Sequence, residues 1–152
     1  MAVNVTVTED VTLIVLHHCP AEIGFIDIVF STVSEANINV DMISVSPPQG
    51  DTSTLSFTIA DNDLTPTLSV IKHLRNVYSE IKSMISSGNS KIQISCEEMR
   101  TSPGFASLAF KAASQAGADI RLITTSEIEI SLLVTKADEK ATYLALKDQF
   151  LN

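Results

Sequence analysis

The sequence is short of basic residues and of long apolar runs, and each shortage excludes a class of function. Lys and Arg together number 10 against 18 Asp and Glu, which gives a formal net charge of −8 at pH 7. Without a basic stripe there is little to displace counterions from a phosphate backbone, so nucleic-acid binding is not expected. The longest apolar run, Leu13–Leu16, is far too short to span a membrane, which takes about 20 residues.

Cysteine is equally scarce. Cys19 and Cys96 are far apart and outside any metal-ligand spacing, and residues 1–10 lack a secretory apolar segment, so we expect a reducing, cytoplasmic location. The stretch His17-His18-Cys19 invites a metal interpretation. Because neighbouring residues of a strand point to opposite faces, His17 and His18 are not expected to share one ion. We therefore expect no metal site and no cofactor.

What the sequence does contain is a repeat with an offset of 80 positions. Gly24-Phe25 recurs as Gly104-Phe105, and Asn37 recurs as Gly117. The other matched pairs are Phe30 with Phe110, Asn39-Val40 with Asp119-Ile120, and Ile43 with Ile123. Two copies of this length in 152 residues indicate a duplicated small domain rather than a solenoid.

Periodicity predicts the elements of each copy. The chain is expected to begin with a strand at 3–7. For the first copy we expect strands at 11–17, 38–46, 54–59 and 81–85, and helices over 25–36 and from Thr65-Pro66, read as N-cap and first helical residue. Glu9-Asp10 reads as a turn, and 86–89 as an inter-domain linker. For the second copy we expect strands at 91–96, 119–125 and 127–135, and helices from 103 and over 137–150. Asn37 and Gly117 suit the left-handed position that ends a helix.

The element order β-α-β-β-α-β is the ferredoxin-like pattern. The first copy has all six elements, whereas the second lacks a final strand and the chain begins with one strand too many. We therefore expect an α+β fold of two ferredoxin-like domains, the first inserted into the second. The predicted domains are residues 11–87 and residues 1–10 plus 88–152.

The loops before the first helix of each copy, 19–24 and 99–104, are candidate ligand sites. Each contains a glycine that lets backbone approach a ligand, and each opens a helix whose free N–H groups suit a carboxylate. The same residues also describe an ordinary turn between strand and helix, and most helix starts bind only water or their own caps.

Charged residues near these loops leave similar alternatives open. Asp41, Glu127 and Glu129 are either solvated hairpin residues or partners for a ligand ammonium group. Arg100 and Arg121 are either surface residues or carboxylate partners. The sequence has no Gly-x-Ser-x-Gly and no Walker A motif, and no catalytic pair can be assembled, so we expect no catalytic residues.

Three motifs carry a resemblance to a known family. They are Leu122-Ile-Thr-Thr-Ser-Glu-Ile128 with Glu129-Ile-Ser131, Met99-x-x-Ser102-Pro-Gly-Phe105, and Asn37-Ile-Asn-Val-Asp-Met-Ile43. Together they resemble the tandem ACT-domain regulatory region of aspartokinases over nearly the whole chain. In that family the N-terminal strand belongs to the second ACT domain.

The resemblance implies feedback inhibition by an end-product amino acid, lysine or threonine or both. It implies a homodimer through the ACT domains and an aspartokinase catalytic domain or subunit as partner. One implied effector site comprises Cys19, Ala21, Glu22, Gly24, Phe25, Asn39, Val40 and Asp41. The other comprises Met99, Ser102, Gly104, Phe105, Ile120, Thr125, Ser126 and Glu127.

The sequence also departs from the family. Arg121 stands where the first copy has Asp41, so the second site is less suited to lysine and the first is expected to be the better effector site. The turn at Glu22-Ile23 differs from the family's usual one and leaves the effector open. The amino-kinase domain is missing, so the alternatives are a regulatory fragment, a separate regulatory subunit, or a free-standing ACT-domain sensor that acts on another protein. A dimerisation module without ligand binding is a further alternative.

Overall fold

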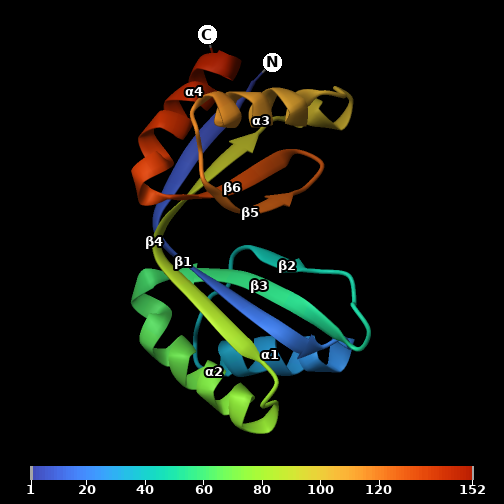
Figure 1. Ribbon diagram of the computed structural model, residues 1–152. Helices are drawn as coiled ribbons and strands as arrows, with labels where there is room; N and C mark the ends of the chain where they lie inside the picture. Colours follow the sequence, from blue (N-terminus) through green and yellow to red (C-terminus); the bar gives the residue numbers. More distant parts are fainter. Residues whose placement is uncertain (1, 152) are drawn as a thin grey trace. The chain divides into compact units, whose positions relative to one another are not determined.

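The chain forms two compact units, each built on an antiparallel sheet with two helices (Figure 1). The structure is a computed structural model that describes residues 2–151. One unit is residues 11–87, here the inserted unit; the other, here the composite unit, is residues 1–10 together with 88–152. Among the described residues, no helix is long and apolar enough to cross a membrane.

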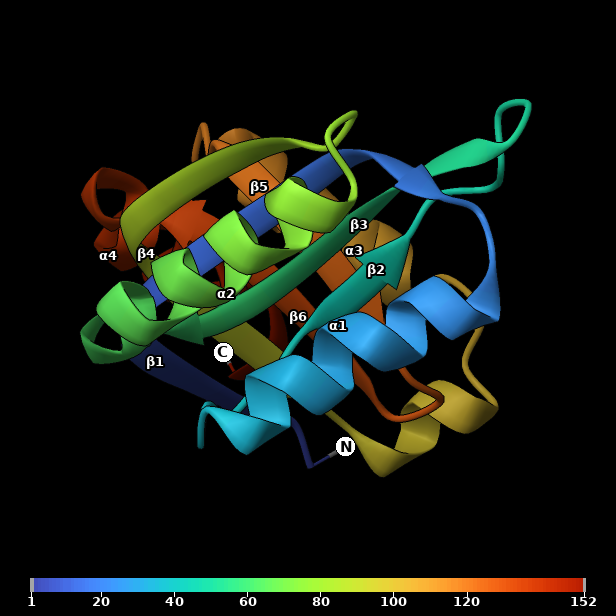
Figure 2. The ribbon, with the colours of Figure 1, turned by 90° about the horizontal axis from the view of Figure 1, so that it is seen from below.

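The inserted unit has the β-α-β-β-α-β order in full. Its elements are β1 (Asn4–Pro20) from Val11 onward, α1 (Ile23–Glu35), β2 (Ile43–Val45), β3 (Thr52–Ala60), α2 (Leu64–Val77) and the first part of β4 (Lys82–Ser95). The strand order β2-β3-β1-β4 is that of a ferredoxin-like sheet. Figure 2 shows α1 and α2 across one face of this sheet.

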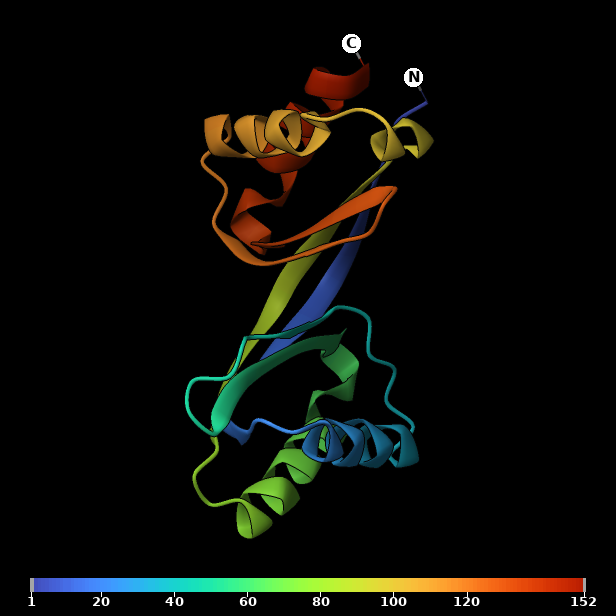
Figure 3. The same cartoon turned by 90° about the vertical axis from the view of Figure 1, so that its right-hand side faces the viewer.

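The composite unit takes its strands from both ends of the chain. It contains β4 from Gly88 onward, α3 (Phe105–Gln115), β5 (Ile120–Thr125), β6 (Glu129–Thr135) and α4 (Glu139–Leu151). The start of β1 completes its sheet in the order β1-β4-β6-β5, and Figure 3 shows β1 beside β4. Val3 and Val5 pack in one core with Ile92 and Ile94. The expected α+β fold, with one ferredoxin-like domain inserted into the other, is confirmed.

The first helices of the two units end in the same hydrogen-bonded motif. Ile38 N–H donates to Val33 O at 3.2 Å and Asn37 N–H donates to Ser34 O at 2.9 Å, with Asn37 at φ 59°. After α3, Ala118 N–H donates to Ala113 O at 3.1 Å and Gly117 N–H to Ser114 O at 3.0 Å, with Gly117 at φ 69°. These are Schellman caps, so the predicted equivalence of Asn37 and Gly117 is confirmed.

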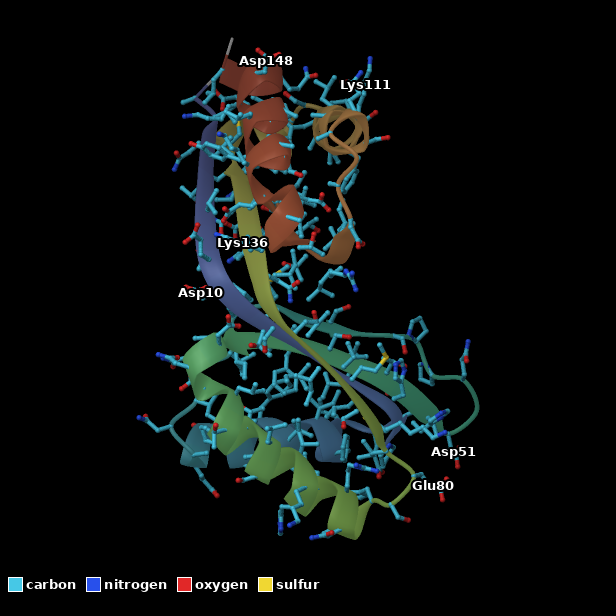
Figure 4. The ribbon with its side chains drawn as sticks, turned by 60° about the vertical axis from the view of Figure 1, so that its left-hand side comes forward. Asp10, Asp51, Glu80, Lys111, Lys136 and Asp148 are labelled. Atoms are coloured by element: carbon cyan, nitrogen blue, oxygen red, sulfur yellow. The ribbon has the colours of Figure 1, made fainter. Side chains whose placement is uncertain are left out.

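Two predicted interruptions lie inside continuous strands. Glu9-Asp10 is not a turn but part of β1, and Ser86–Asn89 is not a loop but part of β4. Asp10 (labelled in Figure 4) has φ 58° and Gly88 has φ 72°, so a residue in the left-handed region lies at each of the two predicted interruptions. Asp and Gly tolerate that region, and their presence therefore does not distinguish a local irregularity in a strand from a turn.

Other boundaries differ from prediction at helix starts and at one strand. Helix α2 begins at Leu64 after a short 3-10 turn (Asp61–Asp63), so Thr65-Pro66 are its second and third residues rather than its cap. Proline is accommodated there because the first N–H groups of a helix have no intrahelical acceptor. The strand expected at 38–46 is only β2, three residues long. Further 3-10 turns at Glu97–Arg100 and Lys136–Asp138 precede α3 and α4.

Candidate functional site

A surface hollow of about 530 Å³ opens in the composite unit where three segments meet. These segments are the 3-10 turn before α3, the first residues of α3, and the turn between β5 and β6. Its lining residues are Met99, Arg100, Ser102, Gly104, Phe105, Ala106, Ser126 and Glu127. Six of the residues that the resemblance implied for the second effector site therefore lie around one hollow: Met99, Ser102, Gly104, Phe105, Ser126 and Glu127.

A glycine with a left-handed backbone conformation lies at the edge of this hollow. Gly104 is the N-cap of α3 and has φ 93°, a conformation that is costly for residues with a Cβ. No side chain caps the helix. The N–H of Phe105 donates to Ser102 O at 3.4 Å. The N-terminus of α3 lies beside the hollow, and its partial positive charge suits an anionic group.

The charge in the hollow is organised around Arg100. Its Nε donates to Glu97 Oε1 at 3.1 Å, and its guanidinium also pairs with Glu127 from the β5–β6 turn. The hydrogen bond that Arg100 donates to Glu97, together with the nearby negative charges of Glu127 and Glu97, raises the pKa of Arg100. All three side chains are about half exposed or more, so the ion pairs are accessible to a ligand. Sequence reasoning missed Glu97, because nothing in a single exposed glutamate indicates which arginine it will meet.

The other side chains around this site lie further in or at its edge. The Phe105 ring is buried and stacks on Phe150, with centroids 4.6 Å apart. Ile120 is half-buried and packs against the composite core, and Thr125 is exposed at the end of β5. Neither lines the hollow. Arg121 pairs with Asp119 at 2.8 Å.

Around the first implied site, two of the side chains face the interior. Cys19 is buried, its Sγ donates to Leu16 O at 3.3 Å, and burial raises its pKa to about 11. Phe25 is buried edge-on against Tyr78, with centroids 4.9 Å apart. These two residues shape the loop from within, and their side chains do not reach its outer surface.

The outer surface of that loop is formed by other implied residues. Glu22 is exposed at the N-cap of α1 and makes no side-chain capping bond, so this helix start is also uncapped. Ala21 is half-buried, and its N–H donates to Asp51 O at 3.0 Å. Beyond α1, Asn39 and Asp41 are exposed, whereas Val40 packs against the core of the inserted unit.

The two glycines matched by the repeat differ in conformation. Gly104 precedes its helix at φ 93°, whereas Gly24 lies inside α1 without a positive φ, and an added Cβ would meet nothing within 4 Å. We expect Gly24→Ala to raise the stability of the protein by about 0.5–1 kcal/mol and Gly104→Ala to lower it by about 1–2 kcal/mol. Urea unfolding of both variants checks this. Equal changes in the free energy of unfolding for Gly24→Ala and Gly104→Ala would show that the two glycines have equivalent backbone conformations.

The described residues give no sign of a cysteine nucleophile or of a metal site with three or more acidic, histidine or cysteine ligands. Burial, reinforced by its bond to Glu98, raises the pKa of Cys96, so neither cysteine is a thiolate nucleophile at neutral pH. Among residues 2–151, no three His, Cys, Asp or Glu side chains gather where they could hold a metal ion.

Comparison with known proteins agrees with the family resemblance that the sequence motifs indicate. Residues 97–150, the greater part of the composite unit with its hollow, match the ACT domain family. The regulatory subunit of aspartate kinase from Thermus thermophilus, in its ligand-free form, superposes with a TM-score of 0.86 at 25% identity, covering 96% of each chain. In sequence and in fold the chain resembles the ACT-domain regulatory region of aspartokinases.

Complete aspartokinases match this chain along nearly its whole length. Aspartokinase from Bacillus sp. (strain MGA3) is 28% identical over 149 residues, which cover 97% of this chain and 36% of that protein. Aspartate kinase from Synechocystis has a TM-score of 0.90 at 28% identity over 97% of this chain and 26% of that one. The chain thus spans about a third of the length of the curated relatives it matches. The ACT resemblance inferred from its motifs is confirmed, and the described residues form no kinase domain.

Proposed function

We propose that this chain is the amino-acid-binding module through which an aspartokinase is feedback-inhibited, with lysine, threonine or both as effectors. The observation that carries the proposal is the superposition on a regulatory subunit over 96% of both chains. Its partner is an aspartokinase catalytic domain or subunit. We further assign one ACT domain to residues 11–87 and the other to residues 1–10 with 88–152.

The hollow in the composite unit suits a zwitterion. The α-carboxylate of an amino acid can be received by the N-terminus of α3 and by Arg100, while its ammonium can be received by Glu127. Without a ligand, Arg100 and Glu127 satisfy each other. When an amino acid binds, the Arg100–Glu127 ion pair is replaced by a contact of Arg100 with the ligand carboxylate and a contact of Glu127 with the ligand ammonium. Both protein charges keep a partner, which limits the cost of removing them from water.

The corresponding site in the inserted unit has a different electrostatic character. Asp41 follows α1 and is exposed, and the start of α1 has no side-chain cap. A carboxylate at this position favours an effector with a second ammonium group, which lysine has and threonine lacks. We therefore propose the loop 19–25 with Asn39, Val40 and Asp41 as the preferred lysine site, and the hollow as a second site of different selectivity.

Inhibition requires only a modest coupling energy. We propose that the regulatory region forms a homodimer by pairing edge strands, because β2 and β5 lie at sheet edges with backbone groups open to pairing. A ligand that favours one arrangement of that dimer by about 1–3 kcal/mol changes activity by a factor of several to about a hundred.

A thermal-shift screen of the twenty amino acids, followed by calorimetry, tests this function. A ligand that binds only the folded state raises the melting temperature once its concentration exceeds its dissociation constant. We expect lysine or threonine to do so, with micromolar to millimolar affinity, about −8 to −4 kcal/mol. Asp41→Asn should weaken the lysine response and Glu127→Gln the response of the hollow. A folded protein that responds to no amino acid would overturn the proposal.

A further inference from the structure

The histidine pair His17-His18 lies at a bulge that overturns the argument from strand alternation. In the β1–β3 ladder Leu16 faces Leu55 and Cys19 faces Ser53, so two histidines oppose the single residue Thr54. His18, the second of these two histidines, has φ 61° and so lies in the left-handed region. Both residues line the same hollow of about 260 Å³, and their ring centroids lie 6.5 Å apart, so the two side chains do not point to opposite faces.

The two rings differ in how they are held. His17 Nδ1 lies 3.3 Å from Thr54 Oγ1, so a proton on Nδ1 leaves Nε2 with a free lone pair. A hydrogen bond at the other ring nitrogen is the usual support of a metal-binding histidine. His18 is exposed and, among the described residues, makes no hydrogen bond, so its ring can rotate.

The separation of the rings is close to that required for sharing an ion. Their centroids are 6.5 Å apart. Two imidazoles on one tetrahedral zinc ion, each at about 2.1 Å, place their centroids about 5 Å apart. A side-chain rotation of His18 covers the difference. The rest of the hollow is lined by hydroxyl and amide groups, such as those of Ser46 and Gln49, which can serve as oxygen ligands or hold bound water.

We propose that His17 and His18 form a binding site for a borderline divalent transition-metal ion such as Zn²⁺, with Thr54 positioning His17. The inference is independent of the proposed function. An ion held there ties the end of β1 to the β2–β3 loop, which should raise the stability of the inserted unit when metal is present. Imidazole ligands predict the affinity order Co²⁺ < Ni²⁺ < Cu²⁺ with no competition from Mg²⁺ or Ca²⁺.

The test is calorimetry of ZnCl₂ and NiCl₂ binding to tag-free protein. His18→Asn and Thr54→Val should each weaken binding about tenfold or more, since loss of a supporting partner alone costs 10–100-fold. The third histidine, His73, lies exposed on α2 and gives the matched control: His73→Asn should change affinity less than about twofold.

A second measurement needs no variant. Co²⁺ or Ni²⁺ added to isotope-labelled wild-type protein should broaden amide signals of residues 17–19 and 46–54 before all others. Absence of metal binding, equal losses for His18→Asn and His73→Asn, or broadening centred elsewhere would each overturn the proposal. Retained binding with the expected order and a selective loss in His18→Asn would establish it.

Discussion

Val5→Asp should unfold the composite unit, whereas Thr6→Asp should leave it folded. Val5 is 7% exposed and packs with Ile92 and Ile94, while Thr6, the next residue along β1, is exposed. The substitution at Val5 forfeits about 1.5–3 kcal/mol of apolar burial and places a carboxylate without a partner in the core. The combined cost, at least about 4 kcal/mol, is comparable with the whole stability of a small domain.

The stabilities of the Val5→Asp and Thr6→Asp variants are measured by urea unfolding, followed by circular dichroism. Amide hydrogen exchange in β4 and β6 reports on the composite unit in particular. Both variants add the same charge to the same strand one residue apart, so charge alone cannot account for a difference between them. If the two variants unfolded at the same urea concentration, the N-terminal strand would not be part of the composite core.

Arg100→Gln should weaken effector binding at the hollow by about tenfold to a hundredfold, the loss expected when a charge-assisted hydrogen bond of about 1.5–3 kcal/mol is removed. Arg121→Gln removes the same charge from the same unit, but Arg121 pairs with Asp119 and does not line the hollow. Its effect should stay within about twofold, because screening makes distant exposed charges weak contributors.

Calorimetry with the effector identified by thermal shift distinguishes these outcomes. Glu127→Gln should also weaken binding, but by a different route, since it frees Arg100 from one partner while removing the ammonium acceptor. Equal affinities for wild type, Arg100→Gln and Glu127→Gln would remove the hollow from the effector site and leave the loop at 19–25 as the candidate.

The sequence predicted the architecture because the repeat and the hydrophobic periodicity are properties of whole elements. Asn37 and Gly117 could be matched across the copies because the left-handed helix end restricts residue type. Local interruptions could not be predicted in the same way. Asp10 and Gly88 adopt positive φ within strands, and a sequence shows only that such residues permit this conformation, not whether the ladder continues beyond them.

The candidate site was predictable in part for a similar reason. The loop before α3 follows from the repeat, and four of its residues line the hollow: Met99, Arg100, Ser102 and Gly104. The pairing of Arg100 with Glu97 and Glu127 depends on how two turns approach each other in space, which no spacing encodes. The histidines failed the alternation rule because a bulge adds a residue to β1, and the partner strand that reveals it lies more than thirty residues away.

The composite unit also sets an order of events during synthesis. Its first strand leaves the ribosome before residues 11–87, but the strands and helices that cover Val3 and Val5 are made last. At about 5–20 residues per second, that interval is roughly ten seconds. Once residue 87 has been made, the inserted unit has all of its own residues, whereas Val3 and Val5 still lack the strands and helices that cover them. Chaperone binding or a non-native strand partner is therefore to be looked for at residues 3–7 of the nascent chain.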